Sequence, residues 1–400
     1  MKGQRKEYID VLRGFAVGCM LVWHTASSWV VPSLQTGSAW AALRAIGGMG
    51  APLFLLLAGV SVTLKGDRRI TAGFDWALLR RGLQIVLLGY LLRLQMWMVD
   101  SGAVVHPNAW QCYLPLLFGF GLGWMALRRA PVDRRSWWLA VLAAFCLLAG
   151  YARVAALFPA RLDGLWRVDV LQIIGVSLVI ITLLISKVRN PTSWLILAIA
   201  VTLVAHELGK LLPGVLPVPI AAYLARWPIP AGARQMAMFP LFPWLAYLLV
   251  GLVAGKWFAR EERGWRILGV AAVGWIAAAL ITESRSYIHD LIVEAPVFTH
   301  LIRVAYRVCV GAGLAGVAYA ACRGLTPGTV PWRLYGQTSL LIYWVHLEFA
   351  FGKAAHLFRP CETLLEWAWK FAALSAAMLA VSYARLNLRF GSLYSSRTNR

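Results

Sequence analysis

The most regular feature of the chain is the alternation of long apolar runs with short polar segments. An α-helix needs about 17 to 25 predominantly apolar residues to cross the hydrocarbon layer of a membrane. The pattern therefore predicts an all-α, polytopic integral membrane helix bundle of about 12 (10–12) transmembrane helices, with residues 1–400 forming a single transmembrane domain. The predicted spans occupy residues 10–31, 46–64, 82–99, 109–127, 136–158, 168–186, 192–211, 238–256, 265–282, 303–322, 334–352 and 366–385.

Composition supports a membrane protein. Hydrophobic residues make up 60% of the chain and charged residues 14%, and the mean hydropathy is +0.66. Because about half of a soluble domain is apolar, this balance excludes an ordinary soluble protein. No low-complexity tract or internal repeat interrupts the pattern. For the Pro-rich stretch 213–243, a re-entrant or interfacial segment is an open alternative.

The formal net charge of +22 is distributed unevenly. Threading the spans alternately from a cytoplasmic N-terminus places 24 of the 39 basic residues, but only 6 of the 17 acidic residues, on the inner side. This bias follows the positive-inside rule and predicts that both termini are cytoplasmic. A nucleic-acid-binding protein would instead gather basic residues and aromatics on one polar face, so no nucleic-acid partner is expected.

Since Asp10 and Arg13 interrupt the first apolar run, we expect an uncleaved first span.

The first span carries three polar groups, Asp10, Arg13 and His24. An α-helix advances about 100° and 1.5 Å per residue, so the eleven-residue step from Arg13 to His24 returns to nearly the same face about 16 Å along the axis. Asp10 precedes Arg13 by three residues, which is close enough to pair. Turned towards lipid, these groups would cost several kcal/mol, so the face is expected to look into the bundle.

With the N-terminus in the cytoplasm, Arg13 is expected near the inner surface and His24 about half a bilayer deeper. Gly14 and Gly18 have the small-xxx-small spacing that predicts a closely packed neighbouring helix. Two structural alternatives stay open, namely that Arg13 is an anchor reaching the headgroups and that His24 is a buried histidine bonded to a neighbour.

The segment IDVLRGFAVGCMLVWH, residues 9–24, resembles the first-helix signature of the large transmembrane acyltransferase superfamily, in which ten residues separate an Arg from a His. Acyltransferase-3 proteins and bacterial relatives of heparan-alpha-glucosaminide N-acetyltransferase both carry versions of it. GAPLFLLLAGVSVTL (50–64) is similar to the second helix of both branches, and YGQTSLLIYWVHLEF (335–349) to a late helix. VDVLQIIGVSLVI (168–180) is closer to the heparan branch.

The resemblance implies an enzyme of the bacterial inner (plasma) membrane. It would move an acyl group, usually acetyl, from cytosolic acyl-CoA to a hydroxyl or amine of an extracytoplasmic carbohydrate or glycan. By the same resemblance, Arg13 helps to hold the CoA side and His24 is required for transfer, with Asp10 orienting Arg13. Arginine suits the phosphates of acyl-CoA, and a neutral His can act as general base. Transient acetylation of His24 is an equally open route, as are O- and N-acylation.

Other predicted spans contain further candidate residues for CoA or substrate binding. Arg80 and Arg81 begin the third span at the inner face and would suit CoA phosphates, although ordinary positive-inside residues look the same. His346 lies at a depth similar to that of His24, with Tyr343 beside it, and both are candidates for substrate binding. Asp169 and Gln172, one turn apart, are further substrate-binding candidates, and for Asp169 a local ion pair is the default alternative.

No metal is expected, because the six cysteines show no metal-ligand spacing and the outer loop with Glu283, His289, Asp290, Glu294 and His300 matches no metal motif. A disulfide between Cys112 and Cys361, both near outer span ends, is an open alternative. The expected partners are the lipid bilayer, acyl-CoA and a carbohydrate acceptor, with homo-oligomerisation left open.

Two rival functions remain. Intramembrane His, Asp and Arg also mark proton relays, so a proton-coupled transporter is the main alternative. Transporters commonly contain repeats, and the second half holds no visible counterpart of Asp10, Arg13 and His24. A scaffold that only binds a partner is the third reading, against which the intact Arg13 and His24 argue.

Overall fold

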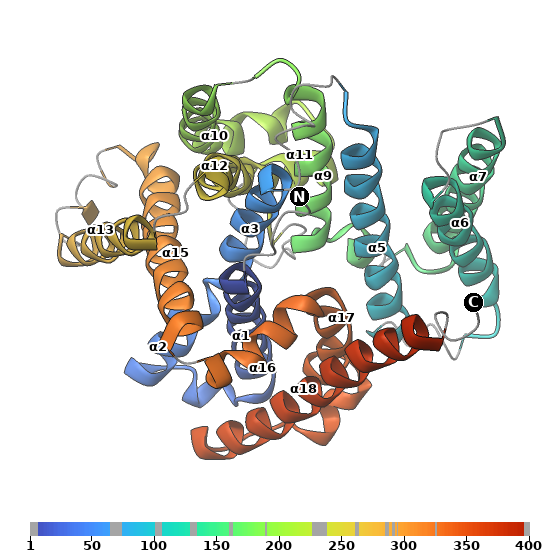
Figure 1. Cartoon of the computed structure of the whole chain (residues 1–400). Coiled ribbons are helices and arrows are strands. Elements are labelled where there is room, and N and C mark those ends of the chain that lie inside the picture. The colour runs from blue at the N-terminus through green and yellow to red at the C-terminus, as the bar shows by residue number, and fades with distance from the viewer. Residues whose placement is uncertain are drawn as a thin grey trace. The chain divides into compact units, whose positions relative to one another are not determined.

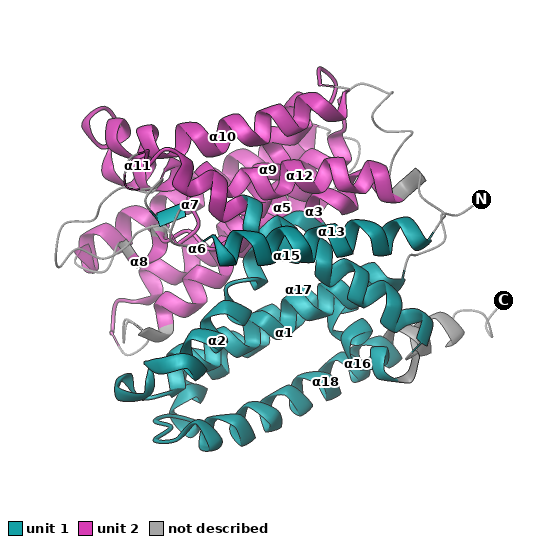
Figure 2. Cartoon of the chain, turned by 90° about the vertical axis from the view of Figure 1, so that its left-hand side faces the viewer, with its two compact units in different colours: residues 1–57, 260–290, 305–400 teal, residues 58–259, 291–304 magenta. Residues whose placement is uncertain are grey.

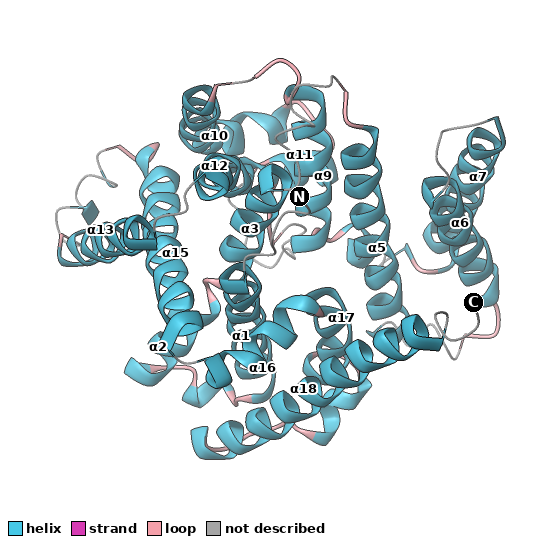
Figure 3. Ribbon diagram, viewed as in Figure 1, coloured by secondary structure: helices cyan, strands magenta, loops and turns pink. Residues whose placement is uncertain are grey.

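The structure is a computed structural model of the whole chain. It describes residues 7–64, 74–100, 106–128, 134–159, 163–188, 190–225, 238–260, 264–284, 288–289, 293, 295–324 and 326–395. Within these ranges the chain is helical, with short loops (Figure 3). It also contains two isolated β-bridges, Val30–Cys361 and Ala225–Phe242. The predicted all-α class is confirmed.

Figure 1 labels the helices. In the first half they are α1 (Glu7–Trp29), α2 (Gly37–Gly47), α3 (Gly50–Leu64), α5 (Trp76–Asp100), α6 (Trp110–Arg128), α7 (Arg134–Leu157), α8 (Asp163–Trp166) and α9 (Val170–Leu184). In the second half they are α10 (Pro191–Leu211), α11 (Val218–Leu224), α12 (Leu241–Arg260), α13 (Gly264–Glu283), α15 (Phe298–Gly324), α16 (Thr326–Gln337), α17 (Ser339–Ala350) and α18 (Leu364–Ser395). The longer helices coincide with predicted apolar runs, whereas α8, α11 and most of α2 and α16 lie outside them.

Eight segments in the described part of the chain are long and apolar enough to cross a membrane. They are Glu7–Trp29, Gly37–Leu64, Arg134–Leu157, Pro191–Gly214, Leu241–Phe258, Gly264–Glu283, Phe298–Gly324 and Leu364–Leu388. Helix α5 carries three arginines along its length, and α9 and α17 are shorter apolar helices. The protein is therefore a polytopic membrane protein, and the count of twelve spans stays a prediction.

One predicted span is wrong as a single helix. The run 334–352 is broken at Thr338, whose φ and ψ of −111° and 16° separate α16 from α17. The Thr338 hydroxyl lies 2.8 Å from the Leu334 carbonyl oxygen and 2.8 Å from the Ser382 hydroxyl of α18. These contacts satisfy polar groups at the break, which a non-helical residue in a membrane bundle requires.

The chain divides into two compact units, each described by itself (Figure 2). Unit 1 comprises residues 1–57, 260–290 and 305–400, and in it α1 contacts α2, α16, α17 and α18. Unit 2 comprises residues 58–259 and 291–304, and in it α5 contacts α6, α8 and α9 while α6 pairs with α7. The single-domain expectation for residues 1–400 stays a prediction.

The core of unit 1 forms around α1. Leu21 and Trp29 of α1, Ile342 of α17 and Met378 of α18 belong to one buried cluster. Lipid tails are as apolar as these side chains, so close van der Waals packing and interhelical hydrogen bonds, rather than escape from water, favour their association in a membrane. This packing places the polar face of α1 beside α16 and α17.

Candidate functional site

Glycines bring α1 and α16 into unusually close contact. A Cβ on Gly14 would overlap the carbonyl oxygen of Trp332, and a Cβ on Gly18 would lie 2.7 Å from the Trp332 ring. In the reverse direction, a Cβ on Gly336 of α16 would overlap the carbonyl oxygen of Asp10. The close helix packing predicted from Gly14 and Gly18 is confirmed, and α16 is the partner helix.

The predicted Asp10–Arg13 pair is also confirmed. The Arg13 Nη1 atom donates to Asp10 Oδ1 at 2.9 Å, and the Asp10 side chain is buried. The Arg13 side chain keeps 23% of its surface exposed. A buried carboxylate therefore holds the guanidinium, and part of the Arg13 side chain stays exposed.

His24 lies further along the same continuous helix, on the face that the eleven-residue spacing shares with Arg13. Its Nδ1 atom is 2.8 Å from Nε2 of His346 on α17. His346 is fully buried, whereas His24 is partly exposed. The structure thus brings together two of the predicted site residues that lie 322 positions apart.

Aromatic rings line the histidine pair. The Phe351 ring packs edge-on against His24 at a centroid distance of 5.3 Å, and Tyr343 packs edge-on against His346 at 5.8 Å. On its other ring nitrogen, Nδ1, His346 is 2.7 Å from the Ile342 carbonyl oxygen one turn earlier in α17. The sequence predicted that the two histidines lie at a similar depth, but no local signal could reveal that they are bonded.

Hydrogen bonds connect the C-terminal end of α1 to α17 and α18. Ser28 donates to the Ala350 carbonyl oxygen, and Trp29 Nε1 donates to the Phe349 carbonyl oxygen at 3.0 Å. The Thr25 hydroxyl accepts from Trp367 Nε1 at 3.1 Å. These bonds fix His24 relative to His346, because they lie within one and a half turns of His24 on the same helix.

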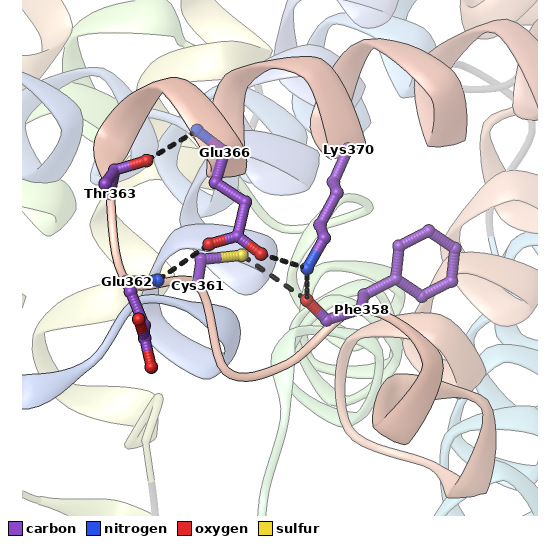
Figure 4. Close-up of polar contacts among 6 residues, drawn as sticks. All are labelled: Phe358, Cys361, Glu362, Thr363, Glu366 and Lys370. Atoms are coloured by element: carbon purple, nitrogen blue, oxygen red, sulfur yellow. Dashed lines mark hydrogen bonds and ion pairs between the residues drawn. The ribbon is translucent and has the colours of Figure 1, made fainter.

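Polar contacts hold the segment that leads into α18 (Figure 4). Lys370 Nζ donates to Glu366 Oε1 at 2.6 Å and to the Phe358 carbonyl oxygen at 2.7 Å. Glu366 in turn accepts from the Glu362 backbone N–H, and its own N–H donates to the Thr363 hydroxyl. The side chains of Glu366 and Thr363 therefore satisfy backbone donors at the start of α18.

Cys361 joins this segment to α1. Its backbone N–H donates to the Trp29 carbonyl oxygen at 2.7 Å, and its thiol lies 3.4 Å from the Phe358 carbonyl oxygen. Burial raises the pKa of the Cys361 thiol, which keeps it neutral. Cys361 and Cys112 are both free and buried. Because they belong to different units, the disulfide considered from the sequence stays a prediction.

The remaining predicted site residues belong to unit 2. Arg80 and Arg81 lie at the start of α5, where Arg80 is partly buried, Arg81 is exposed, and Arg80 Nε donates to the Trp76 carbonyl oxygen at 3.3 Å. Their proposed contact with CoA stays a prediction.

Asp169 is the N-cap residue of α9, and it forms a capping box with Gln172. The Asp169 carboxylate also forms an ion pair with Arg93 of α5. Sequence reasoning missed Arg93, because 76 residues separate the partners. Gln172 is fully buried, and its Oε1 accepts from the Asp169 backbone N–H at 3.1 Å. Substrate binding by either residue stays a prediction.

The described part of the chain holds no group of three or more His, Cys, Asp or Glu side chains that could hold a metal ion. Asp290 and Glu294, two members of the acidic and histidine-containing loop, lie outside the described residues.

The chain was compared with models of known protein families. Residues 5–286 match the family model described as heparan-alpha-glucosaminide N-acetyltransferase, catalytic. The matched region includes Asp10, Arg13 and His24 but ends before Tyr343 and His346. No curated protein and no solved structure matches the chain. The family comprises membrane acetyltransferases that use acetyl-CoA. The match covers well over half of the chain and confirms the resemblance seen in the first helix, so the chain belongs to the heparan-alpha-glucosaminide N-acetyltransferase catalytic-domain family.

Proposed function

We propose that the protein moves an acetyl group from cytosolic acetyl-CoA to a hydroxyl or amine of an extracytoplasmic carbohydrate or glycan, with His24 as the catalytic residue. One observation carries the proposal. Within the family-matched region, α1 holds a partly exposed histidine at 2.8 Å from a second, fully buried histidine. A histidine held this way by another group has the arrangement expected of a general base or a nucleophile.

Arg13 supplies the donor side of the proposed site. It lies eleven residues before His24, about 16 Å along the helix axis. Asp10 orients its guanidinium, and the exposed part of Arg13 is suited to a phosphate of CoA. Arg80 and Arg81 are proposed as additional phosphate ligands. The pantetheine arm of CoA would then lead from the phosphates towards His24.

His24 can act in two ways. As a general base it takes the proton from the acceptor hydroxyl or amine while the acceptor atom bonds to the acetyl carbonyl carbon and the carbon–sulfur bond breaks, releasing CoA. As a nucleophile it first receives the acetyl group itself and then passes it to the acceptor. Both routes need a basic ring nitrogen on the exposed side of His24.

The proposed topology has twelve spans with both termini in the cytoplasm, in a bacterial inner membrane. The positive-inside distribution of basic residues supports it. In addition to the eight strongest candidates, α5, α6, α9 and the α16–α17 pair would complete the count. This orientation puts Arg13 on the side where acetyl-CoA is found.

The test is the release of free CoA by the purified protein, given acetyl-CoA and a panel of amine- and hydroxyl-bearing glycans. We expect turnover by wild type and a loss of at least about 100-fold for His24→Ala, the scale of general base catalysis. His356→Ala is the control, because His356 is an exposed histidine of the same unit. If wild type neither binds acetyl-CoA nor releases CoA, the acetyltransferase proposal fails and proton transport through the same residues becomes the hypothesis to test.

A further inference from the structure

The hydrogen bonds of His346 determine which of its nitrogens carries the proton. Its Nδ1 atom lies 2.7 Å from the Ile342 carbonyl oxygen, which can only accept, so Nδ1 is the donor. In a neutral imidazole the other nitrogen is an acceptor. Nε2 of His346 therefore accepts, and the atom facing it, Nδ1 of His24, must donate. The lone pair of His24 is thereby left on Nε2, its other nitrogen.

Ring geometry supports a well-formed bond between the two histidines. Their planes differ by only 5°, and their centroids are 5.1 Å apart while the bonded nitrogens are 2.8 Å apart. The centroid separation exceeds the nitrogen separation by about the two ring radii. The rings consequently lie edge to edge in one plane, which directs the N–H of His24 straight at the lone pair of His346.

We propose that His346 is a positioning residue for the acetyl transfer: it accepts the Nδ1–H of His24 and so keeps Nε2 of His24 as the basic or nucleophilic nitrogen. This inference rests on the proposed function, and it replaces a substrate-binding role for His346. His346 has no exposed surface, which suits a residue that acts through His24 rather than on substrate. His346 lies outside the family-matched region, so this role rests on the geometry of the histidine pair.

A neutral histidine suits a membrane bundle better than a carboxylate as the group that orients His24. A carboxylate orients the catalytic histidine in many hydrolases, but it would add a permanent charge to a helix bundle in a membrane. His346 is neutral at rest and still offers one acceptor. When Nε2 of His24 takes the acceptor's proton, His24 becomes an imidazolium whose Nδ1–H donates a stronger, charge-assisted bond to Nε2 of His346. The proton leaves again from His24 when the released thiolate or solvent takes it.

The experiment compares two substitutions of His346 in the full-length protein reconstituted in lipid. His346→Gln can place a carbonyl oxygen near the position of Nε2 and keep an acceptor for His24, whereas His346→Leu keeps bulk but removes the acceptor. We expect His346→Leu to lower kcat about 100-fold or more, with the KM for acetyl-CoA changed less than about threefold. His346→Gln should retain at least about a tenth of the wild-type kcat. Ser382→Ala, which removes an equally buried hydroxyl of unit 1, is the matched control.

A second measurement does not depend on turnover or on the two His346 variants. The chain has only 7 histidines, so the nitrogen spectrum of protein labelled with ¹⁵N-histidine can be assigned by comparing wild type with His24→Ala. The expected signature is a protonated Nδ1 and an unprotonated Nε2 for His24. The opposite tautomer, or equal activity of His346→Leu and wild type, would overturn the inference. If wild type releases no CoA but the expected tautomer is found, the proposed function fails while the histidine bond stands.

Discussion

At the residue scale, the two ends of the α1 polar face are held in different ways. Asp10 holds Arg13 from one side and leaves 23% of its side chain exposed. We predict that Arg13→Gln raises the KM for acetyl-CoA roughly 10-fold to 100-fold, the equivalent of one hydrogen bond to a charged group, with a smaller effect on kcat. Steady-state kinetics with varied acetyl-CoA measures this. Arg13→Lys should lie in between, because lysine keeps the charge but loses the bidentate geometry.

The control for Arg13 is Arg44→Gln, since Arg44 is an exposed arginine of the same unit on α2. Its KM for acetyl-CoA should equal that of wild type. An unchanged KM for Arg13→Gln would mean that Arg13 serves only as a membrane-surface anchor.

The contacts of these residues also mark what a sequence can reveal at this scale. The Asp10–Arg13 pair was predictable because helix geometry brings residues three apart onto one face. The bond between His24 and His346 was not, because it depends on how α17 packs against α1. For the same reason the partner of Asp169 proved to be Arg93 of another helix, although a local ion pair was the expectation.

At the element scale, the contact between α1 and α16 depends on having no side chain at Gly336. A methyl group there would overlap the carbonyl oxygen of Asp10, so the helices must separate. We predict that Gly336→Ala destabilises the protein by about 2 kcal/mol, within the range for overpacked sites, and lowers CoA release by disturbing the Asp10–Arg13 pair. Thermal unfolding in detergent and the CoA assay measure the two effects.

Gly269→Ala in α13 is the matched substitution, because nothing lies within 4 Å of a Cβ added there. Alanine favours a helix by up to about 1 kcal/mol over glycine, so this variant should be as stable as wild type or more stable. Equal melting temperatures for Gly336→Ala and Gly269→Ala would contradict the tight contact between α1 and α16.

A second prediction at this scale concerns the joint between α5 and α9. Arg93 and Asp169 are both largely buried, with 15% and 18% of their side chains exposed. Removing one partner leaves a poorly solvated charge, so Arg93→Leu should destabilise the protein by about 3 kcal/mol or more. Arg93→Leu combined with Asp169→Asn should recover much of that loss. Unfolding midpoints of the two single variants and the double variant complete the cycle.

The same variants separate a structural role for Asp169 from a substrate-binding one. A structural pair predicts that the double variant keeps the wild-type KM for the carbohydrate acceptor. A raised acceptor KM in a stable double variant would instead support the substrate-binding role expected from the sequence.

The elements themselves were largely predictable, because apolar length decides where membrane helices form. The break at Thr338 was not. The run 334–352 is apolar enough to continue as one helix, and the contacts that accompany the break come from other helices, namely Ser382 beside Thr338 and Asp10 against Gly336.

At the scale of the whole molecule, the distribution of positive charge predicts twelve crossings, whereas length and apolarity identify eight strong candidates. The twelve-span and eight-span topologies place Lys187 on different sides of the membrane. Between Ser33 and Lys187, twelve spans require crossings by α3, α5, α6, α7 and α9, an odd number that puts the two residues on opposite sides. If only the eight strongest segments crossed, two crossings would put them on the same side.

Cysteine labelling of intact cells with a membrane-impermeant thiol reagent decides between these counts. Ser33, Lys187 and Leu357 are exposed, so each can be replaced by cysteine without emptying the core. With twelve spans, Ser33→Cys and Leu357→Cys should react from outside, while Lys187→Cys should react only after the membrane is permeabilised. The unaltered chain is the background control for its own free cysteines. Labelling of both Ser33→Cys and Lys187→Cys from outside would reject the twelve-span topology. Labelling of Lys187→Cys alone would invert the orientation and move Arg13 away from the side that supplies acetyl-CoA.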